Sequence, residues 1–290
     1  MKPIFKYSGG KSKELKLIKK LLPDNFDEKI NRVVEPFAGS AAVAFGLEKP
    51  AIISDLRENN IITFEAVRDN FDQVFEYIEA IKNKASEYKK SSYTEFLNKE
   101  YYKQRDDMFG CTDPIDVAKR WILLRQLCFS GMDRINEKTG KFNAPFAWYN
   151  KLTCNLSKEH SDLLKTWDLI LGDWKIAYDK ATSNDFVFLD PPYYKRNSEY
   201  GGDYEDNEQL HIDIAEKFFS SPAKSMMVHI DCELYRNLYK DAIIYEKPFT
   251  YSQNFVGRDN SKSKVNHLYI LNYKPEFILK IEEYKTGPLF

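Results

Sequence analysis

Short runs of apolar residues recur along the chain, and polar or turn-forming residues bound each run. Runs of this kind that are rich in β-branched and aromatic residues are typical of buried strands. We expect strands over residues 32–37, 51–55, 167–171, 186–189, 226–230, 242–245 and 267–272. Segments with helical spacing of apolar residues separate several of them, over 12–22, 41–47, 207–219 and 233–240. This alternation predicts an α/β fold with a doubly wound, mostly parallel sheet.

Between the second and third predicted strands, the apolar positions follow helical spacing over a long stretch. Val74 and Ile78, for example, place apolar side chains on one face of a helix. We therefore expect a core domain formed by residues 1–65 and 156–290, with a mainly helical domain inserted over residues 66–155.

The predicted insertion ends in a β-hairpin over residues 135–146, with its turn at 138–141. Basic, polar and aromatic residues interleave on this hairpin and just before it. They are Phe129, Arg134, Asn136, Lys138, Lys141, Phe142 and Asn143. Such a hairpin can enter a groove of nucleic acid, but a solvated hairpin packed on its own helices has the same pattern. The residues alone leave both interpretations open.

The most informative chemistry follows the predicted strand at 186–189, where the chain continues as Asp190, Pro191, Pro192 and Tyr193. Proline cannot donate to a sheet ladder, so the strand ends there. Open α/β sheets bind ligands at the carboxyl ends of their strands. Asp190 and the Pro191 carbonyl are two acceptors and Tyr193 adds a flat face, which together suit a planar base with an NH₂ group. An ordinary junction between a strand and a loop is the alternative.

A second candidate site lies where the first predicted strand leads into a glycine turn, a helix of small residues and a strand that ends in an acid. Gly39 makes the turn, and Asp55 is the acid. This arrangement suits a nucleoside-type ligand, because the glycine lets the backbone approach it and the acid accepts hydrogen bonds from ribose hydroxyls. Ala41 stands where a further glycine would strengthen the pattern.

Composition narrows the class of protein. The chain has 290 residues, 43% of them hydrophobic, and a formal net charge of −1, so we expect a large core and exclude a strongly basic protein. Nucleic-acid binding stays open, because charge can be segregated to one face. The four cysteines and four histidines show no close spacing, so we expect no metal site. With no apolar leader and no membrane-length segment, we expect a cytoplasmic protein.

Four segments together carry a resemblance to a known family. Residues 6–11 are similar to a Lys-Trp-x-Gly-Gly-Lys motif, and residues 35–40 are similar to Glu-Pro-Phe-x-Gly-x-Gly. Residues 130–134 and 140–146 are similar to a hairpin of the form Asn-Gly-x-x-Arg … Gly-x-Phe-Asn-x-Pro-Phe, and residues 190–193 match Asp-Pro-Pro-Tyr. With these motifs in this order, the chain resembles the Dam-like alpha group of DNA adenine methyltransferases.

The resemblance implies a Rossmann-like methyltransferase sheet and an inserted target-recognition domain. It implies S-adenosylmethionine as methyl donor, and as acceptor the 6-amino group of an adenine flipped out of double-stranded DNA. The implied catalytic residues are Asp190, Pro191, Pro192 and Tyr193. The implied cofactor-binding residues are Tyr7, Lys11, Phe37, Gly39, Asp55, Asp173, Trp174 and Asp190. The implied DNA-binding residues are Phe129, Ser130, Met132, Arg134, Asn136, Lys141, Asn143, Arg258, Lys262 and Lys264. No metal is implied.

Individual roles follow from the matched positions. Asp55 would accept hydrogen bonds from the cofactor's ribose, and Asp173 with Trp174 would hold its adenine. Phe129 would fill the space that the flipped adenine leaves in the duplex. Arg134 would read a guanine in the major groove, and the late basic residues would contact phosphates.

Four positions depart from the family pattern, and one of them is Ala41, which stands where the motif has its second glycine. Tyr7 replaces a tryptophan, which keeps a stacking face but shrinks it. Ser130 replaces an asparagine, and Phe129 stands where the family often has tyrosine, so the target sequence stays open. Two other functions stay open as well. One is an amino-methyltransferase acting on another planar amine, such as RNA adenine or cytosine, and the other is a DNA-binding homologue that has lost catalysis. We expect a monomer that binds double-stranded DNA, with a cognate restriction endonuclease as a further candidate partner.

Overall fold

The computed structural model describes residues 1–136, 138–149, 151–194, 208–250 and 264–278 and contains a seven-stranded sheet. The strands are β1 (Arg32–Glu35), β2 (Ala51–Asp55), β3 (Trp167–Leu171), β4 (Asp185–Leu189), β5 (Lys224–Ile230), β6 (Ile243–Thr250) and β7 (Lys264–Leu271). Their order in the sheet is β3-β2-β1-β4-β5-β7-β6. β7 runs antiparallel to both of its neighbours, and the other neighbouring strands pair in parallel. The predicted mostly parallel α/β sheet is therefore confirmed.

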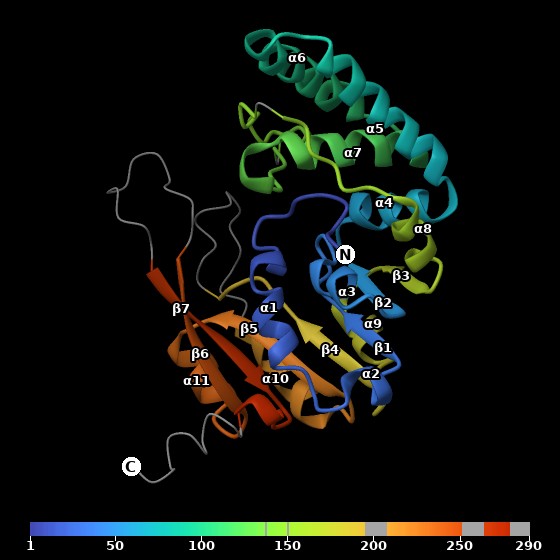
Figure 1. Cartoon of the computed structure of the whole chain (residues 1–290). Helices are drawn as coiled ribbons and strands as arrows, with labels where there is room; N and C mark the ends of the chain where they lie inside the picture. Colours follow the sequence, from blue (N-terminus) through green and yellow to red (C-terminus); the bar gives the residue numbers. More distant parts are fainter. Residues whose placement is uncertain (137, 150, 195–207, 251–263, 279–290) are drawn as a thin grey trace, which may run out of the picture.

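The central strands are buried on both faces of the sheet. Along β4, Phe186 and Phe188 belong to one core, and Val187 and Leu189 belong to the other. Successive side chains of a strand point to opposite faces, which divides them between the two cores. Helices cover both faces (Figure 1). This explains why these strands are continuous apolar runs rather than alternating apolar and polar residues.

Helices also form a further layer beyond the sheet (Figure 1). Up to residue 127, the helices of the described chain, on the sheet and in this layer, are the 3-10 turn η1 (Lys11–Lys13), α1 (Leu15–Lys20), α2 (Phe26–Lys29), α3 (Ala42–Leu47), α4 (Glu58–Asp69), α5 (Phe71–Ser86), α6 (Lys90–Met108) and α7 (Pro114–Leu127). After it they are the 3-10 turn η2 (Phe129–Gly131), α8 (Lys158–Leu164), α9 (Trp174–Tyr178), α10 (Glu208–Ser220) and α11 (Glu233–Leu238). Within the described ranges, no helix combines the length and apolarity needed to cross a bilayer.

Most predicted elements are present with changed boundaries. The predicted helix over 12–22 is divided into the turn η1 and the short helix α1. The strand predicted over 242–245 continues to Thr250, because β6 pairs with β7 along its whole length. Local apolar spacing located these elements, but their ends depend on pairing with distant segments.

The helices α5, α6 and α7 form a layer above α4, away from most of the sheet (Figure 1). This layer lies within the predicted inserted domain over residues 66–155, although the predicted boundary at residue 66 falls inside the continuous helix α4. Asp113 caps α7 by accepting a hydrogen bond from Asp116 N at 2.8 Å, and Pro114 occupies the first turn.

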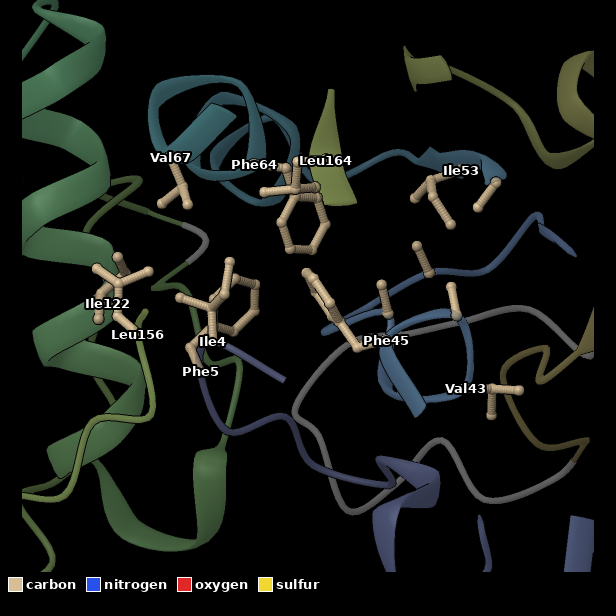
Figure 2. Close-up of a cluster of buried hydrophobic side chains, with 14 of the residues drawn as sticks. Ile4, Phe5, Val43, Phe45, Ile53, Phe64, Val67, Ile122, Leu156 and Leu164 are labelled. Atoms are coloured by element: carbon tan, nitrogen blue, oxygen red, sulfur yellow. The ribbon is translucent and has the colours of Figure 1, made fainter. Parts of the chain in front are cut away.

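The N-terminal segment joins the helical layer to the sheet. Figure 2 shows Ile4 and Phe5 between Ile122 of α7 on one side and Phe45 of α3 on the other. Phe5 also stacks on Phe64 of α4, with ring centroids 5.6 Å apart. All five side chains are buried in one continuous cluster, so the helical layer and the sheet share a core.

The predicted hairpin over 135–146 is present, but as an irregular pair of segments. Isolated antiparallel bridges join Ile135 to Phe142 and Cys128 to Phe146, without regular strands in the described residues. Phe142 and Phe146 are buried in the core shared with the helices. Packing on the helices therefore holds this segment, as a short hairpin requires.

Candidate active site

Asp190 lies directly after β4, at the carboxyl end of the sheet. The order of the strands reverses between β1 and β4, and open α/β sheets bind ligands outside the carboxyl ends of the strands at such a point. Pro191 is buried, Pro192 is exposed, and the strand does not continue through them. The end of this strand is where the two prolines predicted it.

A buried lysine from the N-terminal segment meets Asp190. Lys11 is 2% exposed. Its Nζ donates to Asp190 Oδ2 at 2.6 Å, to Gly9 O at 2.8 Å and to Tyr193 Oη at 3.2 Å. Burial raises the pKa of Asp190, and the charge and hydrogen bond of Lys11 oppose that rise. Lys11, which the resemblance implies as a cofactor residue, thus contacts the proposed catalytic acid directly.

A second acid is buried near this pair. Glu14 Oε2 accepts hydrogen bonds from His267 Nδ1 at 2.8 Å and from the Tyr269 hydroxyl. Burial favours the neutral form of Glu14, but the hydrogen bond from His267 and the charge of Lys11 outweigh it and lower the pKa of this acid. The sequence analysis did not single out Glu14 or His267. Their contact joins the start of α1 to β7, and nothing local in the sequence signals it.

His229 holds the end of the Asp-Pro-Pro-Tyr segment. Its Nε2 accepts from Tyr194 N at 3.2 Å, while its Nδ1 lies 2.7 Å from Ile230 O and can donate to it. Burial lowers the pKa of His229 to about 3, so the ring is neutral near pH 7. The ring stacks on Tyr235, with centroids 3.6 Å apart, and meets Tyr193 edge to face at 5.0 Å. The sequence analysis gave His229 no role.

Asp55 marks the candidate cofactor side of the site, at the end of β2. Its Oδ2 accepts from Gly39 N at 2.7 Å and from Asn60 Nδ2 at 3.1 Å, and its Oδ1 accepts from Arg57 N at 2.7 Å. Burial raises the pKa of Asp55, and these hydrogen bonds oppose the rise. The carboxylate is therefore held in one orientation beside the turn that follows β1.

The glycine turn after β1 is closely covered by an aromatic ring. Gly39 has a φ of +51°, and a Cβ built on it would lie 3.0 Å from Cδ1 of Tyr7. Ala41 also has a φ of +51°, so this alanine takes a conformation that glycine adopts more easily. An aromatic ring, a glycine turn and a fixed carboxylate fit a nucleoside-containing cofactor such as S-adenosylmethionine.

Glu35, the first residue of the 35–40 motif, is buried at the end of β1. Its Oε2 accepts a hydrogen bond from Ala44 N of α3 at 2.8 Å. Burial raises the pKa of Glu35 to about 8, the hydrogen bond from Ala44 opposes the rise, and the charge of Asp190 adds to it. The sequence analysis assigned no role to Glu35, although its place in the motif was a signal.

An aromatic pair lies near the ends of β1 and β3. Phe37 and Trp174 stack with ring centroids 5.9 Å apart and an interplanar angle of 24°. Asp173 is exposed, and its Oδ1 accepts from Lys175 N at 2.9 Å, which caps α9. The structure therefore brings two of the three predicted residues together, while this contact of Asp173 lies within its own helix.

The segment before the hairpin presents several of the implied DNA-binding residues. Phe129 is 43% exposed, Arg134 is exposed, and Met132 is partly buried. Ser130 has a φ of +58°, a conformation that asparagine tolerates better than most residues and that agrees with the family's asparagine at this position. Asn143 is partly buried, and its N donates to Arg134 O at 2.8 Å.

Two implied DNA-binding residues have partners within the helical domain. Asn136 Oδ1 accepts from Lys138 N at 3.0 Å and from Thr139 N at 3.1 Å, which shapes the hairpin turn. Lys141 Nζ lies 4.5 Å from the centroid of the Phe109 ring. These contacts give both residues a local structural role, and their role toward DNA stays a prediction.

The late basic residues are described only in part. Arg258 and Lys262 lie outside the described residues, and Lys264 is the first residue of β7, where it pairs with Thr250. Their contact with phosphates stays a prediction. Among the residues that the structure describes, no group of three or more His, Cys, Asp or Glu side chains could hold a metal ion.

Comparisons with known proteins identify the family of the chain. A family profile described as D12 class N6 adenine-specific DNA methyltransferase matches residues 7–253. The type II methyltransferase M.MjaIII of Methanocaldococcus jannaschii is 30% identical over 294 residues, which cover 94% of this chain and 99% of that protein. The type II methyltransferase M.CviBI of Paramecium bursaria Chlorella virus NC1A is 31% identical over 284 residues, covering 94% of this chain and 100% of that protein. A DNA adenine methylase of Serratia marcescens is 24% identical over 282 residues, covering 92% and 96%.

The family match includes the glycine turn, the helical layer, the hairpin and the Asp-Pro-Pro-Tyr segment. Membership implies S-adenosylmethionine as methyl donor, and the described groups around Asp55 and Tyr7 fit that cofactor. The predicted adenine methyltransferase activity is supported over the alternatives of a different planar amine or lost catalysis. The chain belongs to the D12 class of N6 adenine-specific DNA methyltransferases.

Proposed function

We propose that this adenine methyltransferase acts at a specific sequence in duplex DNA, on an adenine flipped out of the helix, and that Asp190 and the Pro191 carbonyl hold the reacting amino group. The ion pair between Lys11 and Asp190, 2.6 Å long and directly after β4, is the observation that carries the proposal. A buried lysine stabilises the ionised form of the acid, and the ionised carboxylate is a strong acceptor for an amine.

The proposed chemistry follows from the weakness of the nucleophile. The lone pair of an aromatic amine is delocalised into the ring. By accepting the two N–H groups, Asp190 and the Pro191 carbonyl would hold the nitrogen closer to tetrahedral, which frees its lone pair. The charge of Asp190 also stabilises the nitrogen as it becomes cationic. Because Lys11 occupies Oδ2, we assign Oδ1 to the amine, and the extra proton leaves the nitrogen after methyl transfer.

S-Adenosylmethionine supplies an electrophilic methyl group on its sulfonium. We assign Asp55 to the ribose hydroxyls, and the Phe37–Trp174 stack to the face of the adenine. Tyr7 and Gly39 would lie together at the border of the cofactor, because the Tyr7 ring packs on the turn after β1. Holding both reactants in line supplies much of the rate enhancement in such transfers.

The target adenine must leave the DNA stack to reach Asp190, at a cost of a few kcal/mol. We assign Tyr193 to stack on the flipped base, an interaction that contributes about 1–3 kcal/mol. Lys11 donates to the Tyr193 hydroxyl, and His229 packs against the Tyr193 ring in a T-shaped contact. The Tyr193 ring is therefore oriented before the base arrives.

We propose that residues 66–155 form the target-recognition domain. The exposed Phe129 would fill the vacated space in the duplex, and the exposed Arg134 would contact a guanine. The other implied residues would line the same surface or contact phosphates. They are Ser130, Met132, Asn136, Lys141, Asn143, Arg258, Lys262 and Lys264.

The names of two relatives suggest a cellular context. Both M.MjaIII and M.CviBI are named type II methyltransferases. We therefore propose that this chain is the modification enzyme of a restriction–modification system, with a cognate endonuclease, and that it acts in the cytoplasm as a monomer. The proposed chemistry requires no metal.

Transfer of tritiated methyl groups to unmethylated plasmid DNA, followed by chromatography of the nucleosides, tests the proposal. We expect N6-methyladenine as product. Replacing Asp190 with alanine should reduce the rate by about 10²–10³-fold, because the acceptor and the stabilising charge are both lost, while the Kd for DNA stays within twofold. The matched control is Asp179→Ala, which removes an exposed acid that pairs with Lys217. Labelled N4-methylcytosine, or full turnover by Asp190→Ala, would contradict the proposal.

A further inference from the structure

Asp133, which is not among the proposed catalytic or cofactor residues, contacts three side chains from distant segments. Asp133 Oδ2 accepts from Arg57 Nε at 2.9 Å and from Tyr7 Oη at 3.2 Å, and its Oδ1 lies 3.6 Å from Arg125 Nη1. The Asp133 side chain is only 12% exposed. Two guanidinium groups and a hydroxyl therefore converge on one nearly buried carboxylate.

Two of these partners also shape the proposed cofactor pocket. The backbone N of Arg57 donates to Asp55, and Asp55 in turn accepts from Gly39 N. Tyr7 packs on the same turn, because a Cβ built on Gly39 would meet the Tyr7 ring. The contacts form a closed circuit from Asp133 through Arg57, Asp55, Gly39 and Tyr7 back to Asp133.

The third partner, Arg125, joins the segment before the hairpin, residues 129–134 (the recognition segment), to the N-terminal segment. Arg125 of α7 is fully buried, and its guanidinium donates to Gly131 O at 2.9 Å, to Met132 O at 3.0 Å and to Lys6 O at 3.2 Å. Ser8 N also donates to Gly131 O at 2.9 Å. The chain that leads into the hairpin is therefore bonded side by side to residues next to Tyr7.

Gly131 marks how close these two segments lie. Its φ is +65°, and a Cβ on it would lie 3.2 Å from Tyr7 N and from Lys6 Cβ. Asp133 follows two positions later, and the exposed Arg134 comes directly after it. If the recognition segment shifts when DNA binds, Asp133 shifts with it, and the contacts of Asp133 with Arg57 and Tyr7 change.

We propose that Asp133 is a positioning residue that couples DNA recognition to cofactor binding. The Asp133 circuit, formed by Asp133, Arg57, Asp55, Gly39 and Tyr7, makes one arrangement of the hairpin and one arrangement of the cofactor pocket favour each other. Each ligand then raises the affinity for the other by the same factor, since coupling between two binding sites is reciprocal. This inference rests on the proposed cofactor role of Tyr7, Gly39 and Asp55.

The two most direct variants interrupt the circuit at different points. Asp133→Asn keeps the shape of the side chain but removes the charge that holds Arg57 and Arg125. Arg57→Gln breaks the same contact from a side chain that is 39% exposed, so we expect this variant to fold even if Asp133→Asn does not. The matched control is Asp185→Asn, which changes a buried acid that pairs with the partly exposed Arg32 at the opposite end of β4.

Calorimetry with S-adenosylhomocysteine, alone and in the presence of a duplex carrying the sequence that the wild type methylates, measures the coupling. In the wild type, we expect the DNA to lower the Kd for this ligand by at least about fivefold. In Asp133→Asn and in Arg57→Gln, the factor should fall below about twofold, whereas Asp185→Asn should keep the wild-type factor. A merely structural role for Asp133 would lower stability in both Asp133→Asn and Asp185→Asn without separating their coupling factors.

Two results would overturn the inference. One is that DNA leaves the Kd for S-adenosylhomocysteine of the wild type unchanged. The other is that DNA lowers this Kd by the same factor in Arg57→Gln as in the wild type. Failure of the proposed cofactor site gives a different result, because S-adenosylhomocysteine would then bind Asp55→Ala and Gly39→Ala as tightly as it binds the wild type without DNA.

Discussion

At the scale of single residues, the site depends on how buried charges are compensated. Asp190 is one-fifth exposed at its side chain, and Lys11 is almost fully buried against it. A carboxylate removed from water is protonated more easily unless a cation stabilises its ionised form. In the proposed mechanism, the pair therefore sets the pH range in which Asp190 can accept a hydrogen bond from the substrate amine.

Replacing Lys11 with methionine should shift the acid limb of the pH profile of kcat/KM to higher pH. In the proposed mechanism, activity requires ionised Asp190, so it is lost as the pH falls through the pKa of this acid. Burial already places that pKa above its ordinary value, and the charge of Lys11 holds it down. Without that charge the pKa rises further. Lys16→Met, at an exposed lysine of α1, should leave the limb in place, and an unmoved limb in Lys11→Met would contradict this role.

Replacing Gly39 with alanine should lower both stability and cofactor affinity. The left-handed backbone costs an alanine about 1–2 kcal/mol, and its methyl group would press on Tyr7. Urea denaturation measures the first effect and calorimetry with S-adenosylhomocysteine the second. Gly110→Ala is the control, because Gly110 also has a positive φ of +76° but no neighbour within 4 Å of the added Cβ. Gly110→Ala should lose stability as Gly39→Ala does, but should keep the affinity for S-adenosylhomocysteine. An equal loss of this affinity in both variants would contradict a role for the contact between Gly39 and Tyr7.

At the scale of elements, the hairpin and the end of α7 act as one unit. Bridges at 135–142 and 128–146 pair the two sides of the hairpin, and buried aromatic residues anchor it on the helices. Arg134 is exposed at the start of this unit, while Lys141 lies over the Phe109 ring. Because the hairpin is packed on the helices, the backbone at Arg134 is held in place, and its exposed side chain can reach a base edge.

Replacing Arg134 with alanine should relax the sequence preference at one base pair. A guanidinium that contacts a guanine contributes about 1–3 kcal/mol of discrimination. Methylation rates on duplexes with single base-pair changes measure this discrimination. Lys141→Ala is the comparison, and should weaken methylation of all duplexes to a similar extent. An unchanged ranking of the duplexes in Arg134→Ala would exclude direct reading of a base by this residue.

At the scale of the whole molecule, the N-terminal segment holds the helical layer and the sheet in one body. Ile4 and Phe5 are buried between α3, α4 and α7 (Figure 2). The same segment continues to Tyr7, which contacts Asp133, and to Lys11, which contacts Asp190. A segment with contacts on both sides makes the two parts depend on each other for stability.

Replacing Phe5 with alanine should destabilise the whole molecule by about 3–5 kcal/mol, because it leaves a large cavity in the shared core. Urea denaturation followed by tryptophan fluorescence and by circular dichroism should give coincident transitions at a lower midpoint than in the wild type. Phe219→Ala, at an exposed phenylalanine of α10, should change the midpoint little. Two separated transitions in Phe5→Ala would show that the layer and the sheet unfold independently.

Local patterns in the chain were enough to predict the class of the fold and the main motifs. Apolar runs identified the strands, because burial on both faces of a parallel sheet requires them. Two prolines located the end of β4 beside Asp190, since proline ends a ladder. The length of β6 and the irregular hairpin were not predicted, because both depend on partners elsewhere in the fold.

Contacts between distant residues were settled by the tertiary arrangement. Lys11 and Asp190 are 179 positions apart, and Glu14 and His267 are 253 positions apart. No periodicity along the chain encodes such a meeting, since it depends on the order of the strands and on the path of the N-terminal segment across them. The sequence therefore located Asp190 and named Lys11 separately, and only the packing of the sheet brought the lysine into contact with the acid.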